Sequence, residues 1–387
     1  MENFVWNNPT KIIFGKDVEQ KVGEETAKYT KKVLLHYGGQ SIKATGTYDK
    51  VVKSLKEAGV EYVELGGVKP NPRLALVQEG IELCRKEQIG FVLAVGGGSV
   101  IDSSKAIAAG VPYDGDVWDF YSRGVQPQEL LPVGVVLTIP AAGSESSDGS
   151  VITREETSDK RSCCTDLMYP KFAFLDPKLC YTLPKNQVAA GGADILAHIM
   201  ERYFSPAAHT DLSDRLCEGA MISLMDNLPK VLENREDYDA WAEVMWTGNV
   251  GHSGLLGRGR LEDWSSHGIE HEVSAVYDIA HGAGLAIVFP AWMRYVGKVN
   301  PGKLVQFAQR VLNISKEGKD DQTILTEGIK KLEDFYHSLG LVTTLHEAGI
   351  DDNHIDVMAK KAVINGPLGS MMPLGEEDVA NILRLAL

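Results

Sequence analysis

The chain has 387 residues, enough for two domains of roughly 100–200 residues each. It combines 44% hydrophobic with 24% charged residues, which is the composition of a soluble globular protein. The formal charge of −14, with no basic run, argues against a nucleic acid or a membrane surface as partner. No apolar stretch reaches the ~20 residues that span a bilayer, and the first residues lack signal-peptide character. The five cysteines have no CxxC spacing, so we expect a reduced, cytoplasmic protein.

The first half of the chain alternates between two kinds of segment. Short apolar runs that stop near glycine or proline predict buried strands, and apolar residues at i, i+3 and i+4 predict amphipathic helices. The expected strands are 31–39, 60–67, 89–99, 133–140 and 171–177. The expected helices are 49–59, 73–88 and 99–110, the last beginning at Ser99. This alternation predicts a parallel sheet with helices on both faces.

The second half of the chain has helical spacing throughout. The expected helices are 184–204, 210–233, 237–257, 301–314, 322–339 and 376–387. Strand signals fade after about residue 185, and we find no repeat, low-complexity segment or long linker. We therefore predict an α/β domain over residues 1–185 and an all-helical domain over residues 186–387.

The segment "FVLAVGGGSVIDSSKAIA" (91–108) carries the clearest ligand signal of the first half. A buried strand runs into Gly96, Gly97, Gly98 and Ser99, and a helix follows at once. Glycines let a ligand approach the backbone, and a helix N-terminus offers free N–H groups and a positive dipole end. The segment therefore predicts a seat for a pyrophosphate. Its spacing is not G-x-G-x-x-G, so a plain tight turn with Ser99 as N-cap is the alternative.

Two further polar turns follow predicted strands. The first strand ends at Gly38, Gly39, Ser41 and Lys43, and the fourth is followed by "TIPAAGSESSDGS" (138–150). Three such turns at strand C-termini are what a doubly wound sheet needs to bind a dinucleotide. The first turn offers hydroxyl and ammonium donors, with no carboxylate before Asp49. A ribose 2′-phosphate meets no repulsion there, so we predict NADP in preference to NAD.

The helical half carries two pairs of potential metal ligands. Asp194 and His198 form one pair and His267 and His271 the other, each with a spacing of four that puts both side chains on one helix face. His281 follows at a glycine-rich corner. Three imidazoles and one carboxylate suit Fe²⁺ or Zn²⁺ and can leave a position open for substrate. Such a set is provided by Asp194, His198, His267 and His281.

Other interpretations of these residues stay open at this point. His267, Glu270 and His271 fit the inverted zinc-protease pattern H-x-x-E-H, in which Glu270 would be the general base. A non-catalytic nucleotide sensor would also account for the glycine-rich turns. The remaining histidines are isolated in sequence, and we interpret them as structural or surface residues: His36, His209, His252, His337, His346 and His354.

Four motifs together resemble those of the iron-dependent (group III) alcohol dehydrogenases: "GGGSVIDSSKA", "AAGSES", "DILAHIMERY" and "HGIEHEVSAVYDIAHGAGLAI". The resemblance covers essentially the whole chain and is closest to the branch of butanol dehydrogenases and NADPH-dependent aldehyde reductases. It implies a dehydroquinate synthase-like fold with a dinucleotide-binding α/β domain, an all-helical domain and one metal ion. It also implies a homodimer.

The resemblance implies roles for particular residues. The implied metal ligands are Asp194, His198, His267 and His281, which leaves His271 as a catalytic proton relay near the nicotinamide. The implied pyrophosphate motif comprises Gly96, Gly97, Gly98, Ser99 and Asp102, and the adenine-side and nicotinamide-side contacts are Thr138 and Ser144. The NADP-favouring branch is matched at Gly38, Gly39, Ser41 and Lys160. Ser147 departs from the family, in which this position is often Asn.

The implied activity is the interconversion of primary alcohols, such as butanol, and aldehydes by hydride transfer. The expected coenzyme is NADP, with NAD as second choice, and the expected metal is Fe²⁺ or Zn²⁺. A small alcohol or aldehyde is thus the expected partner. A glycerol or other polyol dehydrogenase of the same fold is the nearest alternative.

Overall fold

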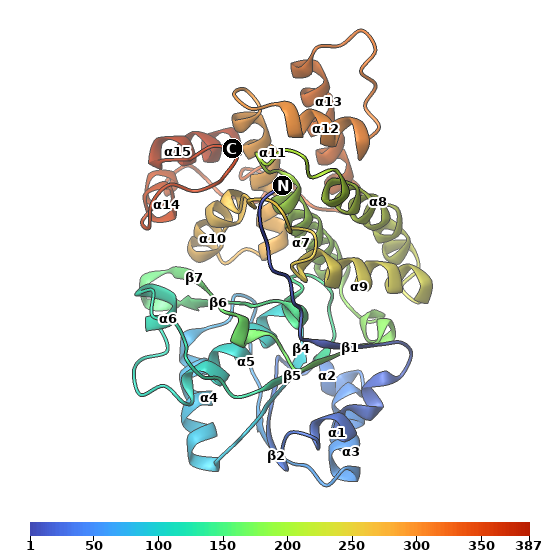
Figure 1. Cartoon of the computed structure of the whole chain (residues 1–387), viewed down its shortest axis with the longest axis vertical. Helices are drawn as coiled ribbons and strands as arrows, with labels where there is room; N and C mark the ends of the chain where they lie inside the picture. Colours follow the sequence, from blue (N-terminus) through green and yellow to red (C-terminus); the bar gives the residue numbers. More distant parts are fainter. The chain divides into compact units, whose positions relative to one another are not determined.

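A computed structural model describes residues 1–387, which fold into two compact units (Figure 1). The α/β unit comprises residues 7–183 and 235–249, and the helical unit comprises residues 1–6, 184–234 and 250–387. Residues 1–6 therefore belong to the helical unit although the α/β unit follows them in sequence, and residues 235–249 belong to the α/β unit although helical-unit segments flank them. Hydrophobic periodicity, which reports local structure alone, carries no sign of this exchange.

Six parallel strands form the sheet of the α/β unit, in the order β1-β8-β5-β4-β2-β3. The strands are β1 (Lys11–Phe14), β2 (Lys32–Tyr37), β3 (Glu61–Leu65), β4 (Val92–Gly96), β5 (Val133–Leu137) and β8 (Phe172–Leu175). The chain passes from β2 to β3 and then returns to the other side of β2 for β4, so the strand order reverses between β2 and β4. Open α/β sheets bind ligands at the carboxyl ends of the strands at such a reversal. The predicted parallel sheet is confirmed, and β1 is an addition to it.

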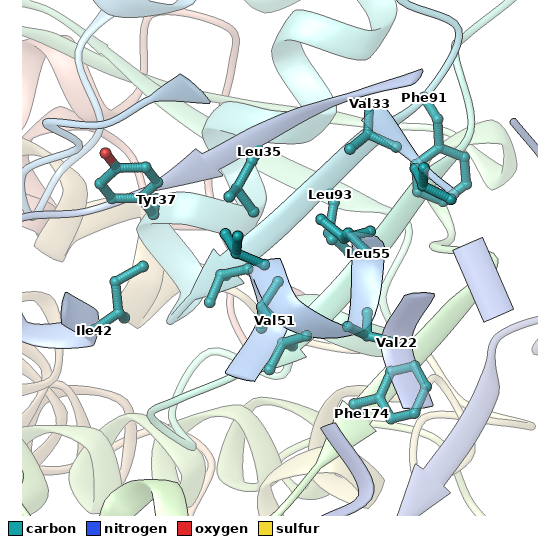
Figure 2. Close-up of a cluster of buried hydrophobic side chains, with 14 of the residues drawn as sticks. Val22, Val33, Leu35, Tyr37, Ile42, Val51, Leu55, Phe91, Leu93 and Phe174 are labelled. Carbon is teal, nitrogen blue, oxygen red and sulfur yellow. The ribbon is translucent and has the colours of Figure 1, made fainter. Parts of the chain in front are cut away.

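The helices of the α/β unit are α1 (Val22–Thr26), α2 (Ser41–Ala44), α3 (Thr47–Glu57), α4 (Leu74–Glu87), α5 (Gly98–Gly110) and α6 (Asp119–Ser122), with short 3₁₀ turns η1 (Val18–Lys21), η2 (Ser144–Ser146), η3 (Glu155–Thr157), η4 (Asp166–Met168) and η5 (Pro177–Cys180). Helices α3 and α5 pack directly on this sheet, and α4 packs on α5. Figure 2 shows Val51 and Leu55, one turn apart on α3, against Leu35 and Leu93 of the sheet. Each such buried side chain contributes roughly 1.5–3 kcal/mol.

A separate antiparallel hairpin, β6 (Gly149–Arg154) and β7 (Asp159–Cys164), lies between β5 and β8 in the chain. The hairpin pairs Thr153 with Lys160, and its turn has Ser158 at a φ of 49°. These two strands are not among those expected from the sequence, and the third polar turn, expected over 138–150, runs into the first of them. Alternating small, polar and charged residues give too weak an apolar signal to mark these strands.

The helical unit is built around one long buried helix. Its helices are α7 (Lys185–Tyr203), α8 (Asp211–Glu233), α10 (Ser265–Tyr277), α11 (His281–Val296), α12 (Gly302–Arg310), α13 (Asp321–Ser338), α14 (Ile355–Ala362) and α15 (Glu376–Leu385), while α9 (Tyr238–His252) has residues in both units. A Cβ at Gly282 of α11 would lie 1.9 Å from the carbonyl oxygen of Ala190 in α7, so glycine permits this close crossing. None of the helices is both long and apolar enough to cross a bilayer.

His36 is a fully buried histidine that joins three elements of the α/β unit. Its Nδ1 lies 2.8 Å from the Leu65 carbonyl oxygen of β3, and its Nε2 lies 2.8 Å from the hydroxyl of Ser103 in α5. The carbonyl accepts a hydrogen bond from Nδ1–H, which leaves Nε2 to accept from the hydroxyl. Burial lowers the pKa of His36 from 6.5 to about 4. The imidazole is therefore a neutral structural group.

This burial predicts a pH-dependent stability. Between pH 6.5 and about 4 the unfolded chain binds a proton at His36 that the folded chain does not bind. The free energy of unfolding therefore falls as pH decreases through this window, by up to about 3 kcal/mol from this residue. In urea unfolding, His36→Gln should lose less stability than the wild type between pH 7 and pH 4.5. His346→Gln, at an exposed site, should follow the wild type, and equal losses for all three proteins would refute the burial effect.

Candidate functional site

The glycine-rich loop after β4 forms the start of α5. The helix begins at Gly98 with Gly97 as N-cap, and the Gly97 carbonyl accepts from the N–H groups of Val100 and Ile101 at 3.0 and 3.1 Å. The helix predicted over 99–110 therefore begins one residue earlier, and the alternative in which Ser99 is the N-cap is wrong. Ser99 lies in the first turn, where N–H groups have no partner within the helix. The glycine loop and the helix N-terminus on which the predicted anion seat depends are thus present in the fold.

The third polar turn packs directly on this loop. A Cβ at Gly97 would lie 2.0 Å from Cγ2 of Ile139, and a Cβ at Gly98 would lie 2.9 Å from Cβ of Ala142. Thr138, at the head of the turn, donates its N–H to the Gly96 carbonyl at 3.1 Å. Glycine at these positions is therefore needed for the two turns to lie against each other. Together they form one surface at the ends of neighbouring strands β4 and β5.

Asp102 ties the same turn to α5. The Ser144 hydroxyl donates to Asp102 Oδ1 at 2.6 Å, and the N–H of Val151 donates to Oδ2 at 3.0 Å. Both oxygens of this predicted coenzyme-binding residue thus bind the protein itself. Asp102 consequently shapes the site through Ser144.

The first polar turn, after β2, has a carboxylate that the sequence analysis did not find. Glu64 of β3 accepts hydrogen bonds from the hydroxyls of Tyr37 and Tyr48 and lies 3.4 Å from Lys43 Nζ. The expectation that no carboxylate lies near this turn is wrong, because Glu64 comes from a neighbouring strand rather than from the residues that follow. The turn itself, including Gly38, Gly39 and Ser41, carries no acidic side chain.

Lys160, the remaining predicted coenzyme residue, lies on β7 of the hairpin with its side chain buried. The hairpin is a separate sheet from the one that carries the three turns. The three turns therefore share one sheet edge, and Lys160 comes from the hairpin that continues the third turn.

The helical unit brings the four predicted metal ligands together. Asp194 and His198 lie one turn apart on α7, His267 lies in the first turn of α10, and His281 is the first residue of α11. Ligand atoms of Asp194, His267 and His281 lie within 4.8 Å of one another. Oδ1 of Asp194 is 3.3 Å from His198 Nδ1 and 3.8 Å from His281 Nε2. We call these four residues the metal quartet.

Two buried glutamates hold the outer nitrogens of two quartet histidines. Glu201 Oε1 lies 2.7 Å from His267 Nδ1, and Glu270 Oε2 contacts His281 Nδ1. An Nδ1–H bonded to a carboxylate leaves Nε2 as the basic atom that binds a metal. Burial and the neighbouring imidazoles hold the pKa of His198 well below its usual range, so this ring is neutral as a ligand must be. The donor set therefore fits Fe²⁺ or Zn²⁺.

Both glutamates were missed as supporting residues. Glu201 follows His198 by three positions on α7, so the helical spacing could have placed it on the same face. Glu270 was considered only as the base of a peptidase. In the structure its side chain is fully buried and engaged by Ser274 and His281. Nothing in this arrangement supports the peptidase interpretation.

Two further histidines border the quartet. The ring of His271 lies 5.4 Å from that of His281, on the turn of α10 that follows His267. The ring of His252 lies 4.2 Å from that of His198, edge to face. His252 is therefore not isolated, because α9 ends beside α7 although the two are far apart in sequence.

A parallel sheet with an edge of glycine-rich turns, and a helical unit with a largely buried quartet of three imidazoles and one carboxylate, are the features expected of a metal- and nicotinamide-dependent oxidoreductase. Two family models match the chain. Residues 9–177 match the iron-containing alcohol dehydrogenase model, and residues 188–387 match the C-terminal model of the Fe-containing alcohol dehydrogenase family.

Individual relatives agree with these matches. Probable NADH-dependent butanol dehydrogenase 1 of Bacillus subtilis is 45% identical over 387 residues, covering 100% of both chains. The NADPH-dependent aldehyde reductase YqhD of Escherichia coli is 38% identical over 97% of this chain and 96% of its own. The crystal structure of NADH-dependent butanol dehydrogenase A from Thermotoga maritima superposes with a TM-score of 0.96 at 42% identity, over 100% of this chain and 99% of that one.

The chain belongs to the iron-containing alcohol dehydrogenase family. It is an NAD(P)-dependent alcohol dehydrogenase, as its motifs predicted.

The supporting glutamates predict a measurable effect on metal affinity. Glu201→Gln and Glu270→Gln keep the side-chain shape but remove the charge that fixes each imidazole. Loss of such a partner weakens metal binding by about 10–100-fold. Competition with a chromophoric chelator measures this affinity, and Glu317→Gln, at an exposed position of the same unit, serves as the control. Wild-type affinity in both variants would contradict the supporting role.

Proposed function

We propose that the metal quartet holds iron and that the three polar turns of the α/β unit hold NAD(P). The family's description favours iron over zinc. When bound, the metal polarises the substrate oxygen as a Lewis acid, and the nicotinamide carries the hydride. The protein accordingly interconverts primary alcohols, butanol among them, and their aldehydes. The observation that supports this most is the pair of buried carboxylates that orient His267 and His281.

We propose His271 as the proton relay of this reaction. It shares the His267 face of α10 without belonging to the quartet, and its half-buried ring lies beside that of His281. An imidazole exchanges protons near neutral pH, and a positioned one contributes roughly 10²–10⁴-fold to rate. His271 would thus move the proton of the substrate hydroxyl while His267 holds the metal.

Two histidine variants one helical turn apart test these roles. The purified wild type should contain iron and oxidise NADPH or NADH with butanal, and a chelator should abolish the reaction. His267→Ala should lose iron and activity together. His271→Ala should keep its iron and slow turnover by about 10²-fold or more. Elemental analysis and absorbance at 340 nm measure both.

Several outcomes would contradict the proposal. Loss of iron in His271→Ala would show that the ligand assignment is wrong. Oxidation of glycerol in strong preference to butanol would favour a polyol dehydrogenase. An iron-loaded wild type without activity on any alcohol or aldehyde, with either coenzyme, would refute the reaction itself.

We propose that the enzyme uses NADPH in preference to NADH. The turn after β2 presents Gly38, Gly39 and Ser41 where NAD-specific sites commonly place a carboxylate for the ribose 2′-OH. Lys43 adds a positive charge that Glu64 partly offsets. The names of relatives do not support this preference: four relatives at 41–45% identity are named for NADH, whereas YqhD, at 38%, is named for NADPH. The proposal therefore rests on the residues of the turn.

A charge placed on this turn tests the coenzyme preference. A Cβ at Gly39 would meet no atom within 4 Å, and its φ is not in the left-handed region, so Gly39→Asp should fold normally. The carboxylate would repel a 2′-phosphate and accept from a 2′-OH. We expect the ratio of kcat/KM for NADPH to that for NADH to fall about tenfold or more. Gly39→Asn, of equal size without the charge, should change the ratio much less, and equal effects of Asp and Asn would contradict the proposal.

A further inference from the structure

Lys105 is a fully buried lysine that none of the motif-based roles includes. It lies on α5, three residues after Asp102 and so on the same helix face, and its side chain has no exposed surface. Lysine is almost never fully buried unless its ammonium has partners, because taking a charge out of water is costly. The partners of this ammonium therefore indicate what the burial achieves.

All the partners of Lys105 belong to the turn that follows β5. The ammonium donates to the Ser144 hydroxyl at 3.0 Å, the Ser147 carbonyl at 2.9 Å and the Gly149 carbonyl at 2.8 Å. The Ser147 hydroxyl lies further away, at 3.4 Å. An ammonium has three N–H donors, so all of them serve this one segment. Lys105 thus fixes the path of residues 144–149 against α5.

The environment of Lys105 affects the charge of its ammonium. The carboxylates of Asp102, Glu145 and Asp148 act on its ammonium and favour the charged form, while burial lowers the pKa of Lys105 to about 8. An apolar side chain of similar length would fill the same space but leave two buried carbonyl oxygens without a donor. An unsatisfied buried acceptor costs roughly 1–3 kcal/mol.

The turn that Lys105 holds is the one that packs on the glycine loop. Ile139 and Ala142 lie against Gly97 and Gly98, and Ser144 is bonded to both Asp102 and Lys105. Asp102 and Lys105 therefore connect α5, whose N-terminus faces the predicted pyrophosphate seat, to the turn that bears the nicotinamide-side residue. The relative position of the two coenzyme-binding turns depends on these two side chains.

We propose that Lys105 is a positioning residue for the coenzyme, holding the serine-rich turn 144–149 in the shape that receives the nicotinamide half. This inference rests on the proposed coenzyme site. The nicotinamide half is identical in NAD and NADP, so Lys105 affects both coenzymes equally. A substitution at Gly39, by contrast, is expected to affect NADPH and NADH differently.

The test measures coenzyme affinity in the iron-loaded enzyme. Lys105→Met removes the donors and the charge, whereas Lys105→Gln keeps two N–H donors without the charge. Fluorescence titration should give Kd values for NADH and NADPH that rise in parallel, by roughly tenfold or more for Met, as expected for loss of hydrogen bonds from a charged donor. The Gln variant should fall between wild type and Met. At saturating coenzyme, kcat should change less than about threefold, and the iron content should be that of the wild type.

Three results would overturn this role. Unchanged Kd values with only a lower melting temperature would make Lys105 a stability residue. A change confined to one coenzyme would place its effect at the 2′ position. A wild type that binds neither coenzyme would instead refute the proposed function, which keeps the two failures distinct.

If the Lys105 variants fail to fold, the pH dependence of coenzyme affinity in the wild type tests the same role. The titratable groups facing Lys105 are Asp102 on its own helix and Glu145, Asp148 and Cys164 from the packed segments. Burial raises the pKa of Cys164 to about 12, so this thiol keeps its proton between pH 7 and 9.5, and burial also raises the pKa of Glu145. Loss of the Lys105 proton should weaken both coenzymes with a midpoint near pH 8. Affinities that stay constant over this range would overturn the proposal.

Discussion

The hydrogen bond between Glu201 and His267 is the interaction on which the helical unit's site depends. The same carboxylate accepts the N–H groups of His267 and Trp264, so it fixes both the imidazole and the start of α10. Trp264 has a φ of 63°, which costs roughly 1–2 kcal/mol for a residue with a side chain. Three hydrogen bonds to one buried carboxylate offset that strain. Without Glu201, the start of the helix that presents His267 and His271 would lose two backbone hydrogen bonds.

The helix that supplies Glu201 explains why such polar groups can be buried. Residues 188 to 203 of α7 are almost all buried, and glycines let α8 and α11 approach it closely. Asp194, His198 and Glu201 form a polar stripe on this helix, at a spacing of four and then three. Apolar side chains of similar volume would often be more stable than buried charges. The surrounding apolar packing offsets the cost of burying this stripe.

Much of this arrangement could be predicted from the sequence. The strand and helix alternation and the apolar spacing of the second half are local signals, and each is confirmed in the structure. Asp194 and His198 form a pair at helical spacing, and His267 forms another with His271, which made three of the four quartet residues visible before any helix was placed. His281 was found by its place at a glycine-rich corner. Glu64, the neighbourhood of His252 and the exchange of residues 1–6 and 235–249 between units depend on segments distant in sequence, and spacing carries no information about them. Ser99 was misplaced because the backbone carbonyl of Gly97, not a serine side chain, determines where α5 begins.

The H-x-x-E-H pattern determines which side chains lie together, but it does not determine their chemical roles. Helical spacing places His267, Glu270 and His271 near one another on α10, and that much is common to a peptidase and to this enzyme. The difference comes from α11, whose first residue, His281, takes the Glu270 carboxylate as its own partner. A glutamate so engaged cannot serve as a base for water, and it instead orients the imidazole of His281. In the α/β unit, Asp102 and Lys105 act in the same way, each directed at a neighbouring turn. In both units, then, polar residues on one face of a buried helix act by fixing a neighbouring segment, and the identity of that segment decides their function.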